Sequence, residues 1–182
     1  MRASGRRPAP TDWGWHRLSD SWARRVVAAG DVSPGDLVLD PGAGTGVLTR
    51  HLLARGARVV AVELHPGRLA ALRRIDSPRL TVVRADVRDL RLPREPFRVV
   101  GNPPFDGSTA LLRRLTARGS RLVGADLVVQ RAAAQRWAEG RAPGAGRWAR
   151  EYSVEVPRSL PRSAFHPRPA VDCAVLQVRR RP

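Results

Sequence analysis

Two short segments of the chain carry side chains with a recognisable chemistry. Residues 40–46 are Asp-Pro-Gly-Ala-Gly-Thr-Gly, and residues 102–105 are Asn-Pro-Pro-Phe. Glycines at alternate positions let the backbone turn sharply and let a ligand approach closely. The second segment places hydrogen-bond acceptors and an aromatic ring on a stiff backbone. In this order the two segments predict a nucleoside cofactor beside a planar amino group that is methylated.

The tetrapeptide at residues 102–105 is suited to hold the exocyclic amine of an adenine. That nitrogen is a poor nucleophile because its lone pair is delocalised into the ring. The side-chain oxygen of Asn102 and the carbonyl oxygen of Pro103 can both accept from the amine, and so favour the pyramidal geometry that frees the lone pair. Phe105 can stack on a base extracted from its helix. The alternative is an ordinary Asn-Pro-Pro turn.

The glycine segment lies between an apolar run at residues 36–40 and a run with helical spacing at residues 47–53. This is the pattern of a strand, a tight turn and a helix start. The spacing is Gly-x-Gly-x-Gly, which favours S-adenosylmethionine over a dinucleotide. Four residues of the segment are predicted to contact this cofactor: Asp40, Gly42, Gly44 and Gly46. A loop with a purely structural role is the alternative.

Two carboxylates follow the next predicted strands. Glu63 ends the apolar run at residues 57–63, and Asp86 ends the run at residues 80–86. An acid at the end of the second strand can accept hydrogen bonds from both ribose hydroxyls, and Asp86 can accept from the adenine amine of the cofactor. Leu64 is predicted to lie against that adenine. A single acid of this kind is more often solvated, but two in a repeating β-α pattern favour a ligand site.

The surrounding pattern predicts a doubly wound α/β fold. A further apolar run at residues 97–101 delivers Asn102, a strand is predicted near residues 152–156, and Cys173 lies in a predicted final strand. Open sheets of this class bind ligands at the carboxyl ends of their strands. Both candidate segments follow such ends, so we expect them to meet at one edge.

Six segments together resemble the Erm-type 23S rRNA adenine-N6 methyltransferases, close relatives of the KsgA-type small-subunit rRNA dimethyltransferases. They are residues 40–49, 60–63, 85–86, 102–105, 127–131 and 165–172. The last of these is Phe-His-Pro-Arg-Pro-Ala-Val-Asp, which DNA adenine methyltransferases generally lack. The resemblance runs from about Trp15 to Arg179. It implies a single Rossmann-like domain with a seven-stranded S-adenosylmethionine-dependent methyltransferase sheet over residues 13–182.

The resemblance also implies an activity: N6-methylation of one adenine in the peptidyl-transferase loop of 23S rRNA. Reduced binding of macrolide, lincosamide and streptogramin B drugs would follow. Alternatives are a KsgA-type 16S rRNA dimethyltransferase, a DNA adenine methyltransferase and a non-catalytic RNA-binding factor with the same fold. The Gly-Ala-Gly turn argues against the first, residues 165–172 against the second, and the intact tetrapeptide against the third. The sequence is compatible with transfer of one or of two methyl groups to the adenine, and with naked rRNA or an assembly intermediate as the substrate.

The chain departs from the family pattern at both ends. The family usually opens with a glutamine that helps hold the methionine end of the cofactor, whereas residues 15–18 are Trp-His-Arg-Leu. In this N-terminal segment, cofactor contacts are therefore predicted only for His16 and Leu18. Asn102 is predicted to contact the same cofactor. The sequence ends soon after residues 165–172, where full-length members continue with a small helical domain. We therefore expect a short form without that domain.

The charge of the chain points to a polyanionic partner. Its 182 residues include 33 basic and 16 acidic side chains, for a net charge of +17. Small soluble domains usually carry a net charge of magnitude about 2 to 8, so rRNA bound through an arginine-rich surface is the predicted partner. An anionic membrane is the weaker alternative, since no amphipathic helix accompanies the charge. We expect the protein to be a monomer that acts in the cytoplasm and uses no metal. Residues 1–12 are expected to form a basic, flexible tail.

Two further predictions concern residues 131–150 and the aromatic residue Phe165. Residues 131–150 are predicted to start as a helix and continue as a flexible basic loop that either clamps RNA or is merely solvated. Phe165 is predicted to form the second wall around the flipped base, opposite Phe105, with a place in the core as the alternative.

Overall fold

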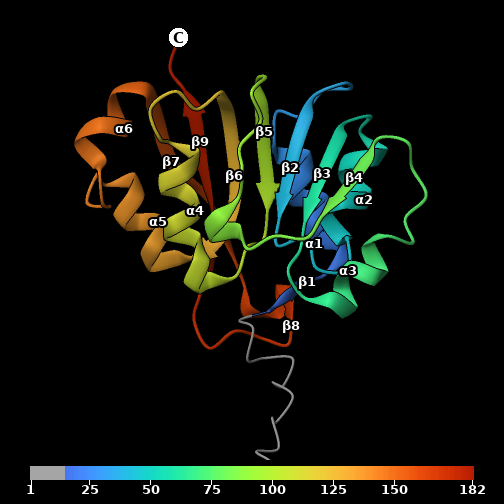
Figure 1. Cartoon of the computed structure of the whole chain (residues 1–182). Helices are drawn as coiled ribbons and strands as arrows, with labels where there is room; N and C mark the ends of the chain where they lie inside the picture. The colour runs from blue at the N-terminus through green and yellow to red at the C-terminus, as the bar shows by residue number, and fades with distance from the viewer. Residues whose placement is uncertain (1–14) are drawn as a thin grey trace, which may run out of the picture.

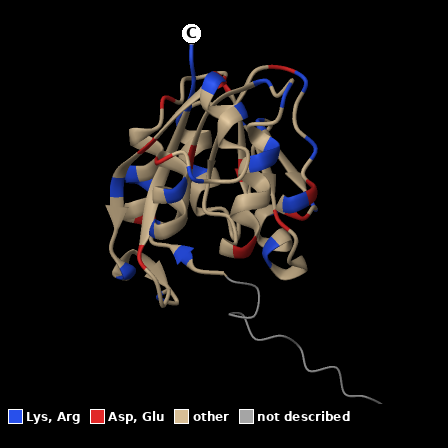
Figure 2. Ribbon diagram, turned by 90° about the vertical axis from the view of Figure 1, so that its left-hand side faces the viewer, with Lys and Arg blue, Asp and Glu red and all other residues tan. Residues whose placement is uncertain are grey.

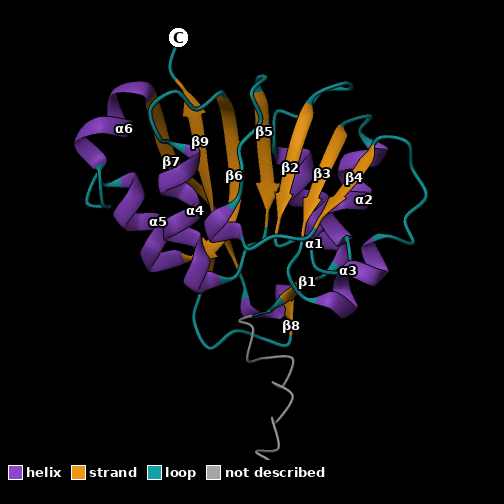
Figure 3. Ribbon diagram, viewed as in Figure 1, coloured by secondary structure: helices purple, strands orange, loops and turns teal. Residues whose placement is uncertain are grey.

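The computed structural model describes residues 15–182. A seven-stranded sheet with the order β4-β3-β2-β5-β6-β9-β7 forms the centre of the molecule, and helices cover both of its faces (Figures 1 and 3). The predicted seven-stranded α/β sheet is therefore confirmed. The predicted basic, flexible tail over residues 1–12 lies outside the described residues.

The strands of the large sheet follow the apolar runs of the sequence. They are β2 (Leu37–Pro41), β3 (Arg58–Val62), β4 (Leu80–Val83), β5 (Phe97–Gly101), β6 (Leu122–Gln130), β7 (Tyr152–Leu160) and β9 (Cys173–Arg180). The helices are α1 (Asp20–Ala29), α2 (Val47–Ala54), α3 (Pro66–Leu72), α4 (Ser108–Leu115), α5 (Arg131–Ala138) and α6 (Ala145–Glu151). No helix among residues 15–182 is both long and apolar enough to cross a bilayer.

The order of the strands determines where a ligand can bind. β2 pairs in parallel with β3 on one side and with β5 on the other, so the chain changes direction across the sheet at this point. The loops after β2 and β5 therefore emerge side by side at the carboxyl edge, which is the usual binding position in open α/β sheets. At the far side, β9 runs antiparallel to both β6 and β7.

Two apolar layers hold the helices against the sheet. One contains leucines of α4 together with Trp137 of α5 and Trp148 of α6. The other contains apolar residues of α1 and α2 against Val38, Val59 and Val100 of the central strands. Since both faces of the central strands are covered, their near-continuous apolar sequences are explained.

A second, two-stranded sheet lies at the carboxyl edge (Figure 1). It joins β1 (Arg17–Leu18) to β8 (Phe165–His166) in antiparallel pairing, with Leu18 opposite Phe165. The amide of Ser19 extends this contact by donating to the carbonyl oxygen of Ala164 at 2.8 Å. Segments from opposite ends of the sequence are thereby joined beside the loops after β2 and β5.

The predicted helix start at residue 131 is confirmed, but the predicted flexible basic loop is wrong for residues 145–150, which are helical. The segment forms two helices, α5 and α6, joined by a short turn in which Gly144 adopts a left-handed conformation with φ 79°. Trp137 and Trp148 are 2% and 4% exposed, and their ring centroids lie 5.0 Å apart. Local glycines and arginines suggested a loop, but burial of the two indole rings orders the segment.

We therefore expect Trp148→Ala to destabilise the whole domain. Removing a buried indole leaves a cavity and typically costs about 3–5 kcal/mol. The exposed neighbour Arg147 provides the matched control, and Arg147→Ala should change the unfolding free energy by less than about 0.5 kcal/mol. Urea denaturation followed by circular dichroism measures both, and equal losses in the two variants would contradict the packing of α6.

Candidate active site

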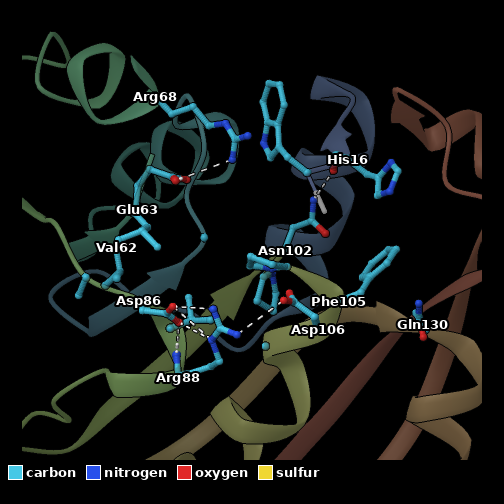
Figure 4. A pocket seen from close by; sticks show the side chains of 18 residues that line it. His16, Val62, Glu63, Arg68, Asp86, Arg88, Asn102, Phe105, Asp106 and Gln130 are labelled. Atoms are coloured by element: carbon cyan, nitrogen blue, oxygen red, sulfur yellow. Dashed lines mark hydrogen bonds and ion pairs between the residues drawn. The ribbon is translucent and has the colours of Figure 1, made fainter. Parts of the chain in front are cut away.

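A cavity of about 600 Å³ opens at the carboxyl edge of the sheet. Its walls come from Trp15 and His16, from the glycine turn, from the residues after β3, β4 and β5, and from Gln130 at the end of β6 (Figure 4). Pockets of about 300–1,000 Å³ commonly hold small ligands. Residues predicted from separate motifs thus share one cavity.

The glycine turn and the tetrapeptide are in direct contact. Gly42 has φ +74°, and a Cβ atom there would lie 3.0 Å from both Pro103 Cα and Pro104 Cδ. A Cβ atom on Gly101 would lie 2.7 Å from Pro41 Cδ. Side chains at either glycine would therefore push the two segments apart.

The other two glycines have different roles. A Cβ atom on Gly44 would lie 2.9 Å from Trp15 Nε1, so this glycine lets the indole ring lie against the turn. Gly46, with φ +91°, would place a Cβ atom 2.6 Å from the side chain of Ile75 and does not line the main cavity. Gly46 thus serves the packing of the α2 start. Gly42 lines the cavity, whereas Gly44 acts through Trp15, which lines it.

Glu63 is held at the edge of the cavity by backbone amides. Its carboxylate is buried and accepts from the Gly44 amide at 2.9 Å and from the His65 amide at 2.7 Å. A carboxylate has about four acceptor positions, so it can still accept from two hydroxyl groups. Leu64 lines the cavity next to it.

Asp86 has a partner that the sequence did not indicate. Both of its oxygens accept from the Arg88 guanidinium, at distances from 2.8 to 3.2 Å, and Arg88 also lies 3.7 Å from Asp106. This hydrogen bonding to Arg88 lowers the pKa of Asp86, which keeps the carboxylate charged and a good acceptor.

Asn102 presents an unused acceptor. Its amide nitrogen donates to the His16 carbonyl oxygen at 2.7 Å, whereas Oδ1 is buried and has no hydrogen-bond partner among the described residues. A buried acceptor without a partner costs about 1–3 kcal/mol. Such a group needs a partner, which a water molecule, an ion or a ligand can provide, and a ligand amine would satisfy this one.

The aromatic residues are arranged differently from the prediction. Phe105 lines the cavity, and its ring stacks on that of His16 with centroids 5.4 Å apart. Phe165 is 3% exposed, belongs to the core and does not line the cavity. The structure therefore does not place Phe165 as a second wall for a base. Its strand position opposite Leu18 explains why it is buried, and Leu18 itself lies beneath the glycine turn rather than in the main cavity.

Asp40 lies below the cavity rather than on its wall. It is completely buried, and its Oδ2 accepts from the Thr49 hydroxyl at 2.6 Å, while Oδ1 has no partner among the described residues. Burial raises the pKa of this carboxyl to about 7. The bond to Thr49 connects the end of β2 to α2, so Asp40 supports the turn from beneath.

Geometry of this kind defines a class of proteins: α/β methyltransferases with a nucleoside pocket at the carboxyl edge of the sheet. The chain belongs to the ribosomal RNA adenine dimethylase family, whose model matches residues 16–182. The family and its structural neighbours are S-adenosylmethionine-dependent methyltransferases, which confirms the predicted cofactor and the resemblance stated above.

Individual relatives support this membership. An rRNA methyltransferase of Streptomyces thermotolerans is 38% identical over 168 residues, covering 87% of this chain and 54% of the relative. An rRNA adenine N-6-methyltransferase of Aeromicrobium erythreum is 36% identical over 173 residues, covering 87% and 48%. The crystal structure of the 23S rRNA methyltransferase ErmE superposes with a TM-score of 0.78 at 31% identity, covering 90% of this chain and 69% of that one. The chain thus spans about half the length of the two curated relatives.

Asp40 should make stability depend on pH. Its pKa is 3.8 when unfolded and about 7 when folded, so ionisation is disfavoured in the native state. The free energy of unfolding should therefore fall as the pH rises from about 4 to 7, by up to roughly 4 kcal/mol. Asp40→Asn should remove that slope, as measured by urea denaturation across this range. The exposed Asp76→Asn is the control, and a slope identical in both variants would refute the raised pKa.

Proposed function

We propose that the protein uses S-adenosylmethionine to methylate the N6 amine of one adenine in the peptidyl-transferase loop of 23S rRNA. The observation that carries the proposal is the unpartnered Asn102 Oδ1, on a segment in contact with the glycine turn. An acceptor for the amine and a cradle for the methyl donor are then neighbours. Reduced binding of macrolide, lincosamide and streptogramin B antibiotics is the proposed consequence.

The residues of the chain would act by positioning. Asn102 Oδ1 and the Pro103 carbonyl oxygen accept from the adenine amine, while Phe105 holds the ring by stacking. The cofactor supplies a methyl group on a positively charged sulfur. The Asn102 and Pro103 oxygens would orient the amine nitrogen toward that methyl group, and one amine proton would be released to solvent when the nitrogen is methylated. Glu63, Leu64 and Asp86 would fix the ribose and adenine of the cofactor.

Two features favour 23S rRNA as the target. The 23S rRNA methyltransferase ErmE resembles the chain in both fold and sequence. The Gly-Ala-Gly sequence at residues 42–44 also resembles the Erm-type version of this turn. A small-subunit rRNA remains the second candidate, because a probable ribosomal RNA small subunit methyltransferase A of Methanopyrus kandleri is 32% identical over 170 residues.

The charge supports an RNA partner. Arginines are spread over helices, strands and loops in Figure 2 rather than gathered on a single element. The net charge of +17 would attract phosphates without choosing a base. We propose that the target base is selected by the cavity and by the shape of the folded RNA loop. We also propose that the protein is a monomer that acts in the cytoplasm.

Transfer of tritium from labelled S-adenosylmethionine tests the proposal. The substrates are 23S rRNA, 16S rRNA and duplex DNA, with the modified base mapped by primer extension. Label at one adenine of the 23S peptidyl-transferase loop is expected. Label found only on 16S rRNA or only on DNA would show that the proposed substrate is wrong. If none of the three substrates became labelled, the proposed methyltransferase activity itself would be contradicted.

Asn102→Ala should abolish most of this activity while leaving cofactor binding nearly intact. Losing one preorganised acceptor lowers turnover by about 100-fold or more, roughly 3 kcal/mol. Single-turnover methyl transfer measures the rate, and calorimetry with S-adenosylhomocysteine checks the cofactor pocket. Turnover near that of the wild type would show that the tetrapeptide does not hold the amine.

Binding to an RNA fragment of the target loop should weaken steeply with salt. Counterion release gives a slope of log K against log salt of about −0.7 per neutralised phosphate on single strands. Residues 1–10 contain Arg2, Arg6 and Arg7, so deleting them should make the slope shallower by at most about 2. The methylated position should stay the same. A salt-independent affinity, or a shifted position after the deletion, would contradict the electrostatic role.

A further inference from the structure

Arg68 is a buried cation inside the cavity. It lies on α3, is 8% exposed and lines the pocket. Its guanidinium covers the Trp15 ring at 4.3 Å from the centroid. Burial lowers the pKa of Arg68 below its ordinary value, with Glu63 acting in the opposite direction. A guanidinium is rarely buried unless acceptors surround it, so its environment requires an explanation.

Among the described residues, the guanidinium has few possible acceptors. The nearest carboxylate oxygen, Glu63 Oε1, is 3.8 Å from Arg68 Nη1, beyond hydrogen-bonding distance. Within residues 15–182, no acceptor lies within hydrogen-bonding distance of the Arg68 side chain. Five N–H donors in a planar fork therefore remain for a ligand.

Arg88, the other arginine that lines the cavity, is differently placed. Both carboxylate oxygens of Asp86 accept from the Arg88 guanidinium, and Asp106 Oδ2 lies 3.7 Å from Arg88 Nη1. Its charge is already compensated. Among the described residues, Arg68 is therefore the arginine of the cavity whose donors remain available to an anion.

The position of Arg68 indicates which part of a ligand it would contact. Figure 4 shows Arg68 and Asp86 on opposite sides of Glu63. If Glu63 holds the ribose and Asp86 the adenine, Arg68 lies toward the other end of the cofactor. Trp15, beneath the guanidinium, lies against Gly44 of the turn. This end of an adenosyl amino acid carries its α-carboxylate.

We propose that the Arg68 guanidinium binds the α-carboxylate of the amino-acid end of the cofactor, with Trp15 holding the guanidinium plane in place. The proposal rests on the proposed function, because that function supplies the cofactor. An arginine suits this role, since its planar fork matches a carboxylate in a bidentate geometry that lysine cannot form. Arg68 would then distinguish adenosyl amino acids from simpler nucleosides.

Calorimetry with two ligands tests the proposal without any turnover. One is S-adenosylhomocysteine, and the other is its decarboxylated analogue, S-adenosyl-3-thiopropylamine, which keeps the adenosine, the thioether and the amine. The wild-type chain should bind the first at least about 10-fold more tightly, the scale of one charge-assisted contact. Arg68→Ala should remove that preference by weakening only S-adenosylhomocysteine, and Arg68→Lys should restore part of it.

Arg73→Ala is the matched control, since Arg73 is the exposed residue that follows α3, and it should leave both affinities unchanged. Equal weakening of both ligands by Arg68→Ala would overturn the proposal, because it would indicate a packing role beside Glu63. Unchanged affinities would overturn it as well. If the wild-type chain bound neither ligand, the proposed function would fail together with this inference, whereas the other two results leave the function intact.

Discussion

The close approach of two loops, after β2 and after β5, is the constraint on which the rest of the site depends. These strands are parallel neighbours, so their carboxyl ends point to the same edge. The loops can touch only because Gly42 and Gly101 have no side chains: a Cβ atom on either would meet Pro103 or Pro41 at 3.0 Å or less. The contact sets the distance between the cofactor cradle and the acceptor on Asn102. Methyl transfer is sensitive to that distance, since misplacing the reacting atoms by about 1 Å can cost 100-fold in rate.

A second set of contacts closes the site from the ends of the sequence. β1 and β8 pair with each other, His16 contacts the Pro167 carbonyl oxygen at 2.9 Å, and Asn102 donates to the His16 carbonyl oxygen. The segment at residues 165–172 therefore does not line the cavity itself but supports residues that do. It holds β1, which bears Leu18 and directly follows His16, and His16 in turn stacks on Phe105. This arrangement gives the family-typical segment a role in positioning rather than in stacking on a base.

Much of the fold could be predicted because its signals are local. Apolar runs gave the central strands, and alternate glycines followed by helical spacing gave the turn before α2. The cavity residues Glu63, Asp86, Asn102 and Phe105 all follow strand ends, so one rule about parallel sheets brings them together. That rule needs no knowledge of tertiary packing.

The misses share a physical cause, which is that they depend on contacts between distant elements. Arg68 and Arg88 are ordinary arginines in a chain of 33 basic residues, and only the fold places them in the cavity. Helix α6 forms because the buried Trp148 packs against Trp137, which outweighs the glycines around it. Phe165 is drawn into the core by its pairing with β1.

The central claim is that contact between the two loops positions the reaction, and Gly101→Ala tests it most directly. Gly101 is buried in β5 and does not line the cavity, so an added methyl group touches Pro41 rather than a ligand. Single-turnover methyl transfer to the 23S fragment should slow by about 100-fold, with the variant still folded by circular dichroism. Gly146→Ala, where no atom lies within 4 Å of the added Cβ, should keep the wild-type rate. A folded Gly101→Ala protein that transferred methyl groups at the wild-type rate would contradict the account.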